Sequence, residues 1–178
     1  MKISFKKMIT TISYSILAIL VILFFTGTNR IETQSTIIID EKIDKVWETM
    51  GLNFADVHLW SSNFKTSKPE GIKKFEGINY SKRVTTTERG LTIQELDNFD
   101  NENFRLQYHI TEGKPPIAKE ALSNWYLEET PTSQTKAVFE FTMVTRGAKA
   151  RLLSFIIKRK IQGSGDQIAN ELKAFIEN

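Results

Sequence analysis

The spacing of apolar residues predicts two short helices directly after a strand. The β-branched run STIIID at 35–40 is typical of a strand. Asp40 is the expected N-cap of the first helix, because its carboxylate can accept a hydrogen bond from the first turn. A second helix is expected over NFADVHLW at 53–60, with Asn53 as its cap. Apolar residues recur at the intervals of one helix face in the first helix (Ile43, Val46, Trp47, Met50) and again in the second (Phe54, Val57, Trp60).

Between residues 61 and 145 the pattern changes to alternating and β-branched segments separated by turn residues, which predicts consecutive strands. In 103–112, for example, apolar and polar residues alternate as in a half-buried strand. Glu88-Arg89-Gly90 is the expected hairpin turn. Its register stays open between a two-residue Arg-Gly turn and a three-residue turn with Gly90 left-handed. The expected strands cover 61–68, 79–87, 91–99, 103–112, 119–129 and 135–145.

From Ala148 to the end of the chain, apolar residues return to helical spacing, which predicts one long helix. Gly163 and Gly165 fall within it. Glycine costs about 1 kcal/mol relative to alanine in a helix, so the pair implies a kink, a break or close packing against the sheet. The stripe expected to face the sheet consists of Leu153, Ile157, Ile161, Ile168, Leu172 and Phe175.

The order of elements is therefore a strand, two short helices, about six consecutive strands and a long helix. Runs of strands followed by a helix indicate an α+β fold with an antiparallel sheet. Neighbouring strands joined by short turns can curl around the last helix. We expect sheet and helix to enclose a cup.

The N-terminal stretch MITTISYSILAILVILFF at 8–25 is apolar and uncharged. At 1.5 Å rise per residue it spans roughly 27 Å, just enough for the hydrocarbon core of a bilayer. Three lysines precede it, which favours a cytoplasmic N-terminus and an exported C-terminal domain. We therefore expect residues 1–30 to be a single-pass membrane anchor with its flank, and residues 31–178 to be the folded domain.

A cleavable signal peptide is the main alternative for this segment. Its hydrophobic region is usually shorter and is followed by a small-residue cleavage site. Here the apolar run ends FFTGTNR, in which Thr26-Gly27-Thr28 is a weak match. Either reading exports the domain, whereas a buried core helix, the third alternative, would not.

The formal net charge of +3 is concentrated at the N-terminus. Residues 1–30 contain Lys2, Lys6, Lys7 and Arg30 and no acid, which leaves 20 basic against 21 acidic side chains in the remainder. A nucleic-acid binder needs a concentrated phosphate-neutralising surface, so we expect no nucleic-acid partner. The absence of cysteine excludes disulfides, thiolate catalysis and cysteine-ligated metals.

The segment STIIIDEKIDKVWETMGLNFADVHLWSS at 35–62 combines a strand, a Val46-Trp47 helix and a short helix ending at Trp60. SNWYLEETPTSQTKAVFEF at 123–141 then precedes the long helix. In these features, over nearly the whole domain, the chain resembles the START/polyketide-cyclase-like (SRPBCC, Bet v 1-like) superfamily. The resemblance implies a helix-grip fold, in which a curved antiparallel sheet wraps around a long C-terminal helix. It also implies a cavity between sheet and helix, usually for an apolar or amphipathic molecule.

Lys82 and Glu95 are candidate polar anchors for such a ligand. They lie on the two strands that flank the Gly90 turn, and they point inward if the apolar faces of these strands line the cup. A buried charge is costly unless it is paired, hydrogen-bonded or reserved for a polar ligand. The alternative is a solvated sheet face with cross-strand charge pairs.

Four aromatic residues occupy alternating positions that we expect to turn inward. Core packing is the default explanation for such residues, but in a cup the same side chains form the apolar wall that a ligand touches. We name them, together with Lys82 and Glu95, as the expected ligand-binding residues. They are Tyr108, Trp125, Phe139 and Phe141.

Motifs for catalysis or metal binding find little support in the sequence. His58 and His109 lie 51 residues apart, without metal-ligand spacing. Gly163-Ser164-Gly165 lacks the lysine and the preceding strand of a phosphate-binding loop. We predict no catalytic residues, no metal site and no cofactor.

A basic stretch without acids runs from residue 146 to residue 160. A solvated helix face is the default explanation. The alternative is docking against anionic lipid headgroups, which would add to the membrane tether. The basic residues are Arg146, Lys149, Arg151, Lys158, Arg159 and Lys160.

The leading interpretation is a membrane-anchored binding or carrier domain for a small hydrophobic or amphipathic ligand. One alternative is a cyclase- or hydratase-type enzyme, in which Glu95, Lys82 or Tyr108 acts as an acid–base group in a dry pocket. Another is a protein-interaction module with a filled core and an exposed apolar patch. The identity of the ligand and the oligomeric state do not follow from the sequence.

Overall fold

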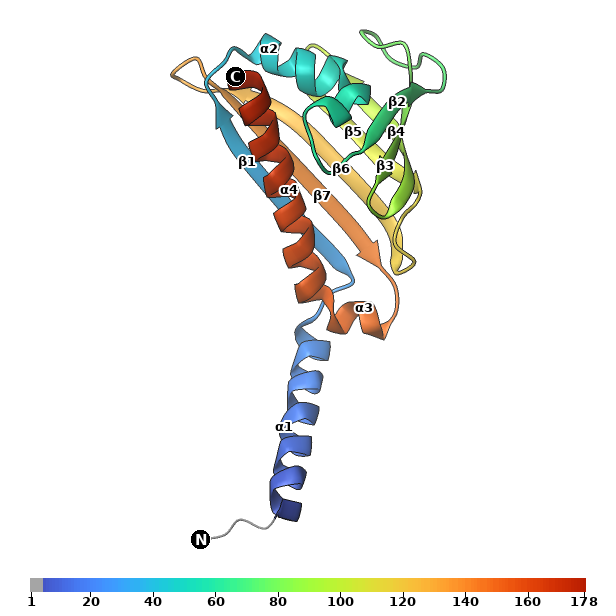
Figure 1. Ribbon diagram of the computed structural model, residues 1–178, viewed down its shortest axis with the longest axis vertical. Helices are drawn as coiled ribbons and strands as arrows, with labels where there is room; N and C mark the ends of the chain where they lie inside the picture. The colour runs from blue at the N-terminus through green and yellow to red at the C-terminus, as the bar shows by residue number, and fades with distance from the viewer. Residues whose placement is uncertain (1–4) are drawn as a thin grey trace.

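The computed structural model describes residues 5–178, with side chains from residue 11 onward. The described residues form one antiparallel sheet with a long helix laid across it, and an N-terminal helix that projects away from the sheet (Figure 1). In chain order the elements are α1 (Phe5–Thr26), β1 (Arg30–Ile39), α2 (Ile43–Trp47), a π-helical turn η1 (Glu48–Leu52), a 3-10 helix η2 (Phe54–Leu59), β2 (Thr66–Glu70), β3 (Lys82–Thr87), β4 (Gly90–Asp100), β5 (Arg105–Glu112), β6 (Ala118–Glu129), β7 (Thr135–Thr145), α3 (Ala148–Leu152) and α4 (Ser154–Glu177).

The seven strands of the described residues pair in the order β1-β7-β6-β5-β4-β3-β2. From β2 to β7 each strand pairs with the next along the chain, and β1 closes the edge beside β7. The helix α4 runs along β1 and β7, while α2 and the following turns cover the far end of the sheet (Figure 1). The predicted α+β helix-grip architecture is confirmed.

The two faces of the sheet differ in what covers them. The inner face is the side toward α4, α2, η1 and η2, and the outer face is the opposite side. Successive residues of a strand point to opposite faces, so buried residues at alternate positions of β5 and β6 mark the inner face. They are Leu106 and Tyr108 on β5 and Ala121, Ser123, Trp125 and Leu127 on β6.

Two apolar clusters fill the inner face unequally. The larger one lies toward α2 and η2 and joins aromatic residues of the sheet to Val46, Trp47 and Met50. The smaller one contains three buried residues, Ile31, Ala118 and Met143. The core is therefore concentrated at one end of the space between sheet and α4.

The helical region after β1 follows the predicted apolar face but not the predicted caps. The residues of the predicted apolar face are buried, except Ile43, which is partly exposed. Asp40, however, does not cap α2, which begins at Ile43 without a side-chain cap. Instead, the Asp40 carboxylate accepts a hydrogen bond from Gln134 Nε2 at 3.3 Å. Asn53 precedes η2 as expected but makes no side-chain cap hydrogen bond.

The C-terminal helical region is divided at Leu153, which separates α3 from α4. Leu153 and Phe175 are half-exposed, so the predicted stripe is wrong at both ends. At the C-terminal end Ile176 takes the buried position, together with Leu172. Phe175 and Ile176 both fit the helical period after Leu172, and packing against the sheet buries Ile176.

Gly165 explains why α4 lies so close to β1. A Cβ atom at Gly165 would lie 2.7 Å from Ser35 Oγ, whereas at Gly163 it would meet nothing within 4 Å. The helix runs through both positions without a break. Of the three predicted explanations for the glycines, close packing against the sheet applies to Gly165.

Gly163→Ala should therefore raise the free energy of unfolding by about 1 kcal/mol, because alanine favours the helix and meets no neighbour. Gly165→Ala should show no such gain. Its Cβ would displace the Ser35 hydroxyl, which donates to Asp166 Oδ1 at 2.6 Å, and a lost hydrogen bond costs about 1 kcal/mol. Urea denaturation of the two variants measures the difference. An equal gain in both would contradict close packing at Gly165.

The N-terminal helix α1 emerges from the end of the domain where α3 lies (Figure 1). Arg151 connects the two parts: its Nε donates to the Gly27 carbonyl at 3.0 Å, and its guanidinium lies 5.1 Å from the centre of the Phe24 ring. Within the residues whose side chains are described, no helix combines the length and the apolar character needed to cross a membrane. The predicted span of 8–25 begins at residues 8–10, whose side chains lie outside that description.

Candidate ligand-binding site

Lys82 and Glu95 form a cross-strand ion pair on the outer face. They sit directly opposite each other in the β3–β4 register, and Lys82 Nζ lies 3.0 Å from Glu95 Oε2. Lys74 Nζ approaches Glu95 Oε1 at 2.7 Å from the loop before β3. Hydrogen bonds from Lys74 and Lys82 lower the pKa of Glu95. Of the two alternatives for this pair, the structure contains the sheet face with cross-strand charge pairs and not the inward-pointing polar anchor.

The hairpin turn accounts for this register. Thr87 pairs with Gly90, so the turn consists of Glu88 and Arg89, one residue earlier than the predicted two-residue turn. Gly90 has a φ of +111°, a conformation that glycine adopts without strain. This register also places Arg83 opposite Gln94, on the other face of the same two strands.

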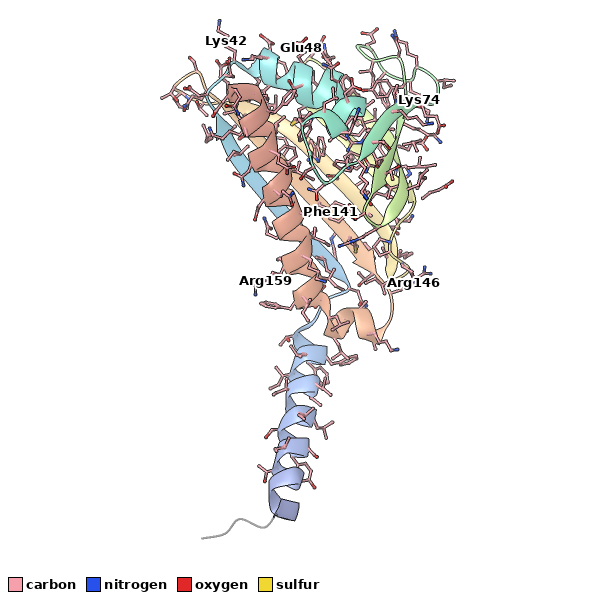
Figure 2. The ribbon with its side chains drawn as sticks, viewed as in Figure 1. Lys42, Glu48, Lys74, Phe141, Arg146 and Arg159 are labelled. Carbon is pink, nitrogen blue, oxygen red and sulfur yellow. The ribbon has the colours of Figure 1, made fainter. Side chains whose placement is uncertain are left out.

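The predicted aromatic residues lie on the inner face. Trp125 is at the centre of a ring cluster, with ring centres 5.5 Å from Tyr108 and 5.1 Å from Phe139. Phe141 lies on the same face but is only partly buried, against the smaller apolar cluster. Figure 2 shows Phe141 beside the middle of α4. Their proposed contact with a ligand stays a prediction.

Arg83 is the inner-face residue that sequence reasoning missed. Its side chain is 0% exposed. Nη1 donates to the Phe54 carbonyl at 2.7 Å, and Nε donates to Gln94 Oε1. The guanidinium carbon lies 3.6 Å from the centre of the Phe54 ring. Three further rings surround it at 5.2–5.4 Å, those of Trp125, Tyr108 and Phe64.

The guanidinium of Arg83 keeps its charge in this environment. Burial lowers the pKa of Arg83 to about 10, against the opposing influence of Tyr108 and Tyr80. This value still leaves the side chain protonated at neutral pH. Among the described residues, no carboxylate forms an ion pair with Arg83, and its Nη2 has no hydrogen-bond partner. The site therefore offers a cation and a free donor within an aromatic wall.

Hydroxyl groups extend the polar part of the site from Arg83 along β3 and its neighbours. Thr85 and Thr92 face each other with their Oγ1 atoms 2.6 Å apart. Ser67, which pairs with Thr85 from β2, is buried and its Oγ has no partner among the described residues. The inner face is thus amphipathic: it is aromatic and apolar on β5–β7 and polar around Arg83, Thr85 and Gln94 on β3 and β4.

The signal that could have found Arg83 is the pairing of polar residues across the hairpin. If Lys82 is opposite Glu95, then Arg83 is opposite Gln94 on the other face. Gln94 shares its face with Leu96, an apolar residue two positions along the same strand. Leu96 pairs with the buried Tyr108 of β5, so Leu96, Gln94 and Arg83 can all be placed on the inner face.

A groove lies between η2 and the C-terminal half of α4, which we call the η2–α4 groove. It has a volume of about 490 Å³. Trp60 connects it to the aromatic cluster, with its ring centre 6.3 Å from that of Trp125. A second hollow, of about 270 Å³, lies on the outer face around Arg105 and Glu140, away from Arg83. The groove is lined by His58, Leu59, Trp60, Ser61, Ser62, Glu171, Ala174 and Phe175.

Glu171 ties the two walls of this groove together. Its Oε2 accepts hydrogen bonds from Ser61 Oγ at 2.9 Å and from the Ser62 amide at 3.0 Å. Its Oε1 accepts from Ser62 Oγ and from Gln167 Nε2. Burial acts to raise the pKa of Glu171, but these hydrogen bonds outweigh it and the pKa is lowered.

The Glu171 contacts should make stability depend on pH. Because the folded pKa lies below the ordinary value of 4.5, the contribution is present above that value and is lost as the pH falls through the folded pKa. Glu171→Gln should lower the free energy of unfolding by about 1.5–3 kcal/mol at neutral pH. It should also weaken the loss of stability toward low pH, which we call the acid limb. Urea denaturation between pH 3 and 7 measures both.

Two controls isolate the effect of Glu171. Glu88→Gln removes an exposed carboxylate paired with Lys65 and should leave the acid limb unchanged. The same series in a His58→Gln background removes the other titratable group that lines the groove. An unchanged acid limb in Glu171→Gln would contradict its role.

The two histidines do not come together. His58 lines the η2–α4 groove, and its Nδ1 is buried without a hydrogen-bond partner among the described residues. His109 is on the outer side of β5, with Nδ1 2.7 Å from Asp97 Oδ1. In the described part of the chain, no three His, Asp or Glu side chains are grouped so as to hold a metal ion.

Comparison with solved structures identifies the fold. A START superfamily protein from Mycobacterium smegmatis matches with a TM-score of 0.66 at 10% identity, covering 83% of this chain and 97% of that one. The Zhui aromatase/cyclase from Streptomyces sp. R1128 matches with a TM-score of 0.61 at 15% identity, over 83% and 94%. The protein XoxI from Bacillus cereus matches with a TM-score of 0.63 at 18% identity, over 83% and 96%.

No family model matches the sequence, and no curated protein matches it either. The structural matches cover 83% of this chain, and at 10–18% sequence identity they are evidence of the fold. The chain has the helix-grip fold of the START/polyketide-cyclase-like superfamily.

Proposed function

We propose that this protein binds and carries a small hydrophobic or amphipathic molecule between the sheet and α4. The observation that supports the proposal is the unequal filling of the inner face. Toward α2 and η2 the large apolar cluster packs the space. Toward α3 only a small cluster is buried, and Phe141, Ile157 and Ile161 stay partly exposed around it. This end offers apolar side chains that a ligand would cover.

Binding without catalysis is favoured over the enzyme alternative. A cyclase- or hydratase-type reaction needs an acid–base group facing the substrate. Lys82 and Glu95 face the other side of the sheet, so Tyr108 is the one candidate left from the predicted set. Arg83 stays protonated at neutral pH and is suited to binding an anion rather than to moving a proton.

The ligand proposal is tested by extraction and native mass spectrometry of the full chain isolated in lipid nanodiscs. We expect a co-purifying apolar molecule, or stoichiometric binding of an added one. Phe141→Ser should reduce the bound fraction severalfold by placing a hydroxyl in the apolar wall. Leu122→Ser, a similarly half-buried position on the outer face of β6, should not. Equal binding by both variants, or no binding by the wild type, would overturn the proposal.

We further propose that residues 8–25 anchor the protein in a membrane, with the domain on the exported side. The uncharged apolar stretch and the preceding lysines support this. From residue 12 to residue 25 nearly all large apolar side chains of α1 are exposed, and the helix stands apart from the sheet (Figure 1). Exposed apolar residues on all sides of a helix are typical of contact with lipid.

The base of the domain, where α1 joins it, is suited to lie on an anionic bilayer surface. Leu153, Phe155 and Ile156 are 50%, 77% and 55% exposed there. Arg146 and Arg159 lie at the same end of the domain (Figure 2). Apolar and basic side chains next to an anchor favour contact with headgroups. We expect the full chain to stay in membranes washed with carbonate. We also expect protease added outside the cell to cleave the domain. Extraction of the chain by carbonate, or protection of the domain from the protease, would contradict the proposal.

A further inference from the structure

Arg83 is a buried cation without a counter-charge in the described part of the chain. The ion pairs of the neighbouring residues are directed elsewhere, since Glu95 pairs with Lys74 and Lys82 on the outer face. Gln94, the direct partner of Arg83, is neutral. An isolated ion in a protein interior costs several kcal/mol, so buried charges are normally paired.

The surrounding groups compensate this cost only in part. Nη1 and Nε are hydrogen-bonded to neutral acceptors. Stacking of the guanidinium on the Phe54 ring, 3.6 Å from its centre, is favourable in a desolvated site but does not replace a counter-charge. Nη2 stays without a partner, although buried polar atoms are nearly always hydrogen-bonded. The unsatisfied end of the guanidinium therefore calls for an acceptor, and a negatively charged one compensates most.

We propose that Arg83 binds the carboxylate of an amphipathic ligand whose apolar body lies along the inner face. This inference rests on the proposed ligand-binding function and names the chemical class of the ligand. A planar carboxylate matches the guanidinium in shape and charge. Phe54, Tyr108 and Trp125 would surround the carboxylate end. The apolar body would extend toward Phe141 and the adjacent part of α4.

A carboxylate fits better than a phosphate ester for two reasons. A phosphate carries up to two charges and three acceptor oxygens, and it usually needs several donors. The free donors near Arg83 are few: Ser67 Oγ has no partner among the described residues, and the bond between the Thr85 and Thr92 hydroxyls uses one of their two protons. Of the four rings around the guanidinium, those of Phe54 and Phe64 carry no donor, and those of Tyr108 and Trp125 carry one each.

The test compares three probes that share one apolar body and differ in the polar end: naphthalene-2-carboxylate, naphthalene-2-carboxamide and 2-naphthyl phosphate. Binding to the full chain in nanodiscs is measured by calorimetry, with empty nanodiscs as the blank. We expect the carboxylate to bind at least about tenfold more tightly than the amide and the phosphate, since a charged hydrogen bond in a buried site distinguishes such ligands strongly.

Variants then assign the preference to Arg83. Arg83→Met should bring the carboxylate and amide affinities within about twofold of each other while amide binding persists. Lys82→Met, which removes a cation from the adjacent residue on the outer face, should keep the full preference. Circular dichroism checks the fold of each variant. If Arg83→Met does not fold, the comparison of carboxylate and amide binding to the wild type still tests whether the site prefers an anion.

The outcomes separate this inference from the proposed function. Equal wild-type binding of carboxylate and amide overturns the anion assignment and leaves the ligand-binding function in place. Tighter binding of the phosphate overturns the assignment to a carboxylate. Binding of none of the probes, together with no co-purifying apolar molecule, overturns both.

Discussion

Trp125→Ala should lower the free energy of unfolding by about 3–5 kcal/mol, the range found when a large buried aromatic side chain is truncated. Trp125 is 2% exposed and lies at the centre of the inner face. Four other rings surround it, with centre-to-centre distances between 5.1 and 6.3 Å. They belong to Phe54, Trp60, Tyr108 and Phe139.

The position of Arg83 places the expected cost at the upper end of this range. Its guanidinium lies 5.2 Å from the centre of the Trp125 ring, so the truncation removes part of the aromatic surround of a buried cation. It also leaves a cavity next to a charge, which the core can fill only by moving neighbouring rings. Loss of Trp125 therefore affects the core and the proposed carboxylate site together.

Tyr126→Ala is the matched control, because the adjacent residue points to the outer face of the same strand. There Tyr126 is partly exposed and lies under the guanidinium of Arg105, at 4.7 Å. An exposed contact of this kind contributes about 0.5–1 kcal/mol. Urea denaturation followed by far-ultraviolet circular dichroism measures both variants without relying on tryptophan fluorescence. Similar losses in the two would show that the inner face does not hold the core.

The strands and the main helix follow from periodicity because their burial is one-sided. β7 has the predicted bounds of 135–145, and its inner positions alternate with outer ones, with Val138 as an outer position that is also buried. The long helix follows equally well from residue 154 onward. Patterns of this kind are imposed by the hydrophobic effect on each segment separately, so they can be read from the sequence.

The details that depend on contacts between distant segments could not be predicted in this way. Asp40 is a suitable cap by residue type, yet its carboxylate meets Gln134, which is 94 positions away. The face that Arg83 shares with β4 depends on whether the hairpin turn has two residues or three, because this difference of one residue reverses the faces of the β3 side chains relative to β4. Lys82 and Arg83 are both basic, so composition alone does not show which of them is buried.

The burial of Arg83 also reverses the usual expectation for an arginine. Charged residues are rarely fully buried, so sequence reasoning places such a residue on the surface unless a partner is evident. Here the partners are neutral oxygens and rings from η2 and β4–β6, brought together only by the closed fold. A buried charge left without a counter-charge in the described chain is the feature that most directly suggests a function for the inner face.

Replacing Leu17 and Leu20 by arginine together should move the protein out of the membrane fraction. Both side chains are exposed on α1, three positions apart and therefore on one face of the helix. Near the centre of a transmembrane helix each arginine costs about 2.5–3.5 kcal/mol. Two of them reduce insertion of the proposed anchor by at least about a thousandfold.

The matched control adds the same charge elsewhere. Leu59 and Leu91 are exposed on the folded domain, so replacing both by arginine should leave membrane retention unchanged. The domain should stay folded in both variants, since Phe24 and Gly27, not Leu17 or Leu20, contact Arg151 at the junction. Carbonate extraction followed by immunoblotting of the pellet and supernatant gives the distribution. Retention of the Leu17/Leu20 variant in the pellet would show that the exposed apolar surface of α1 is not in the bilayer, and a contact within an assembly would then have to cover it.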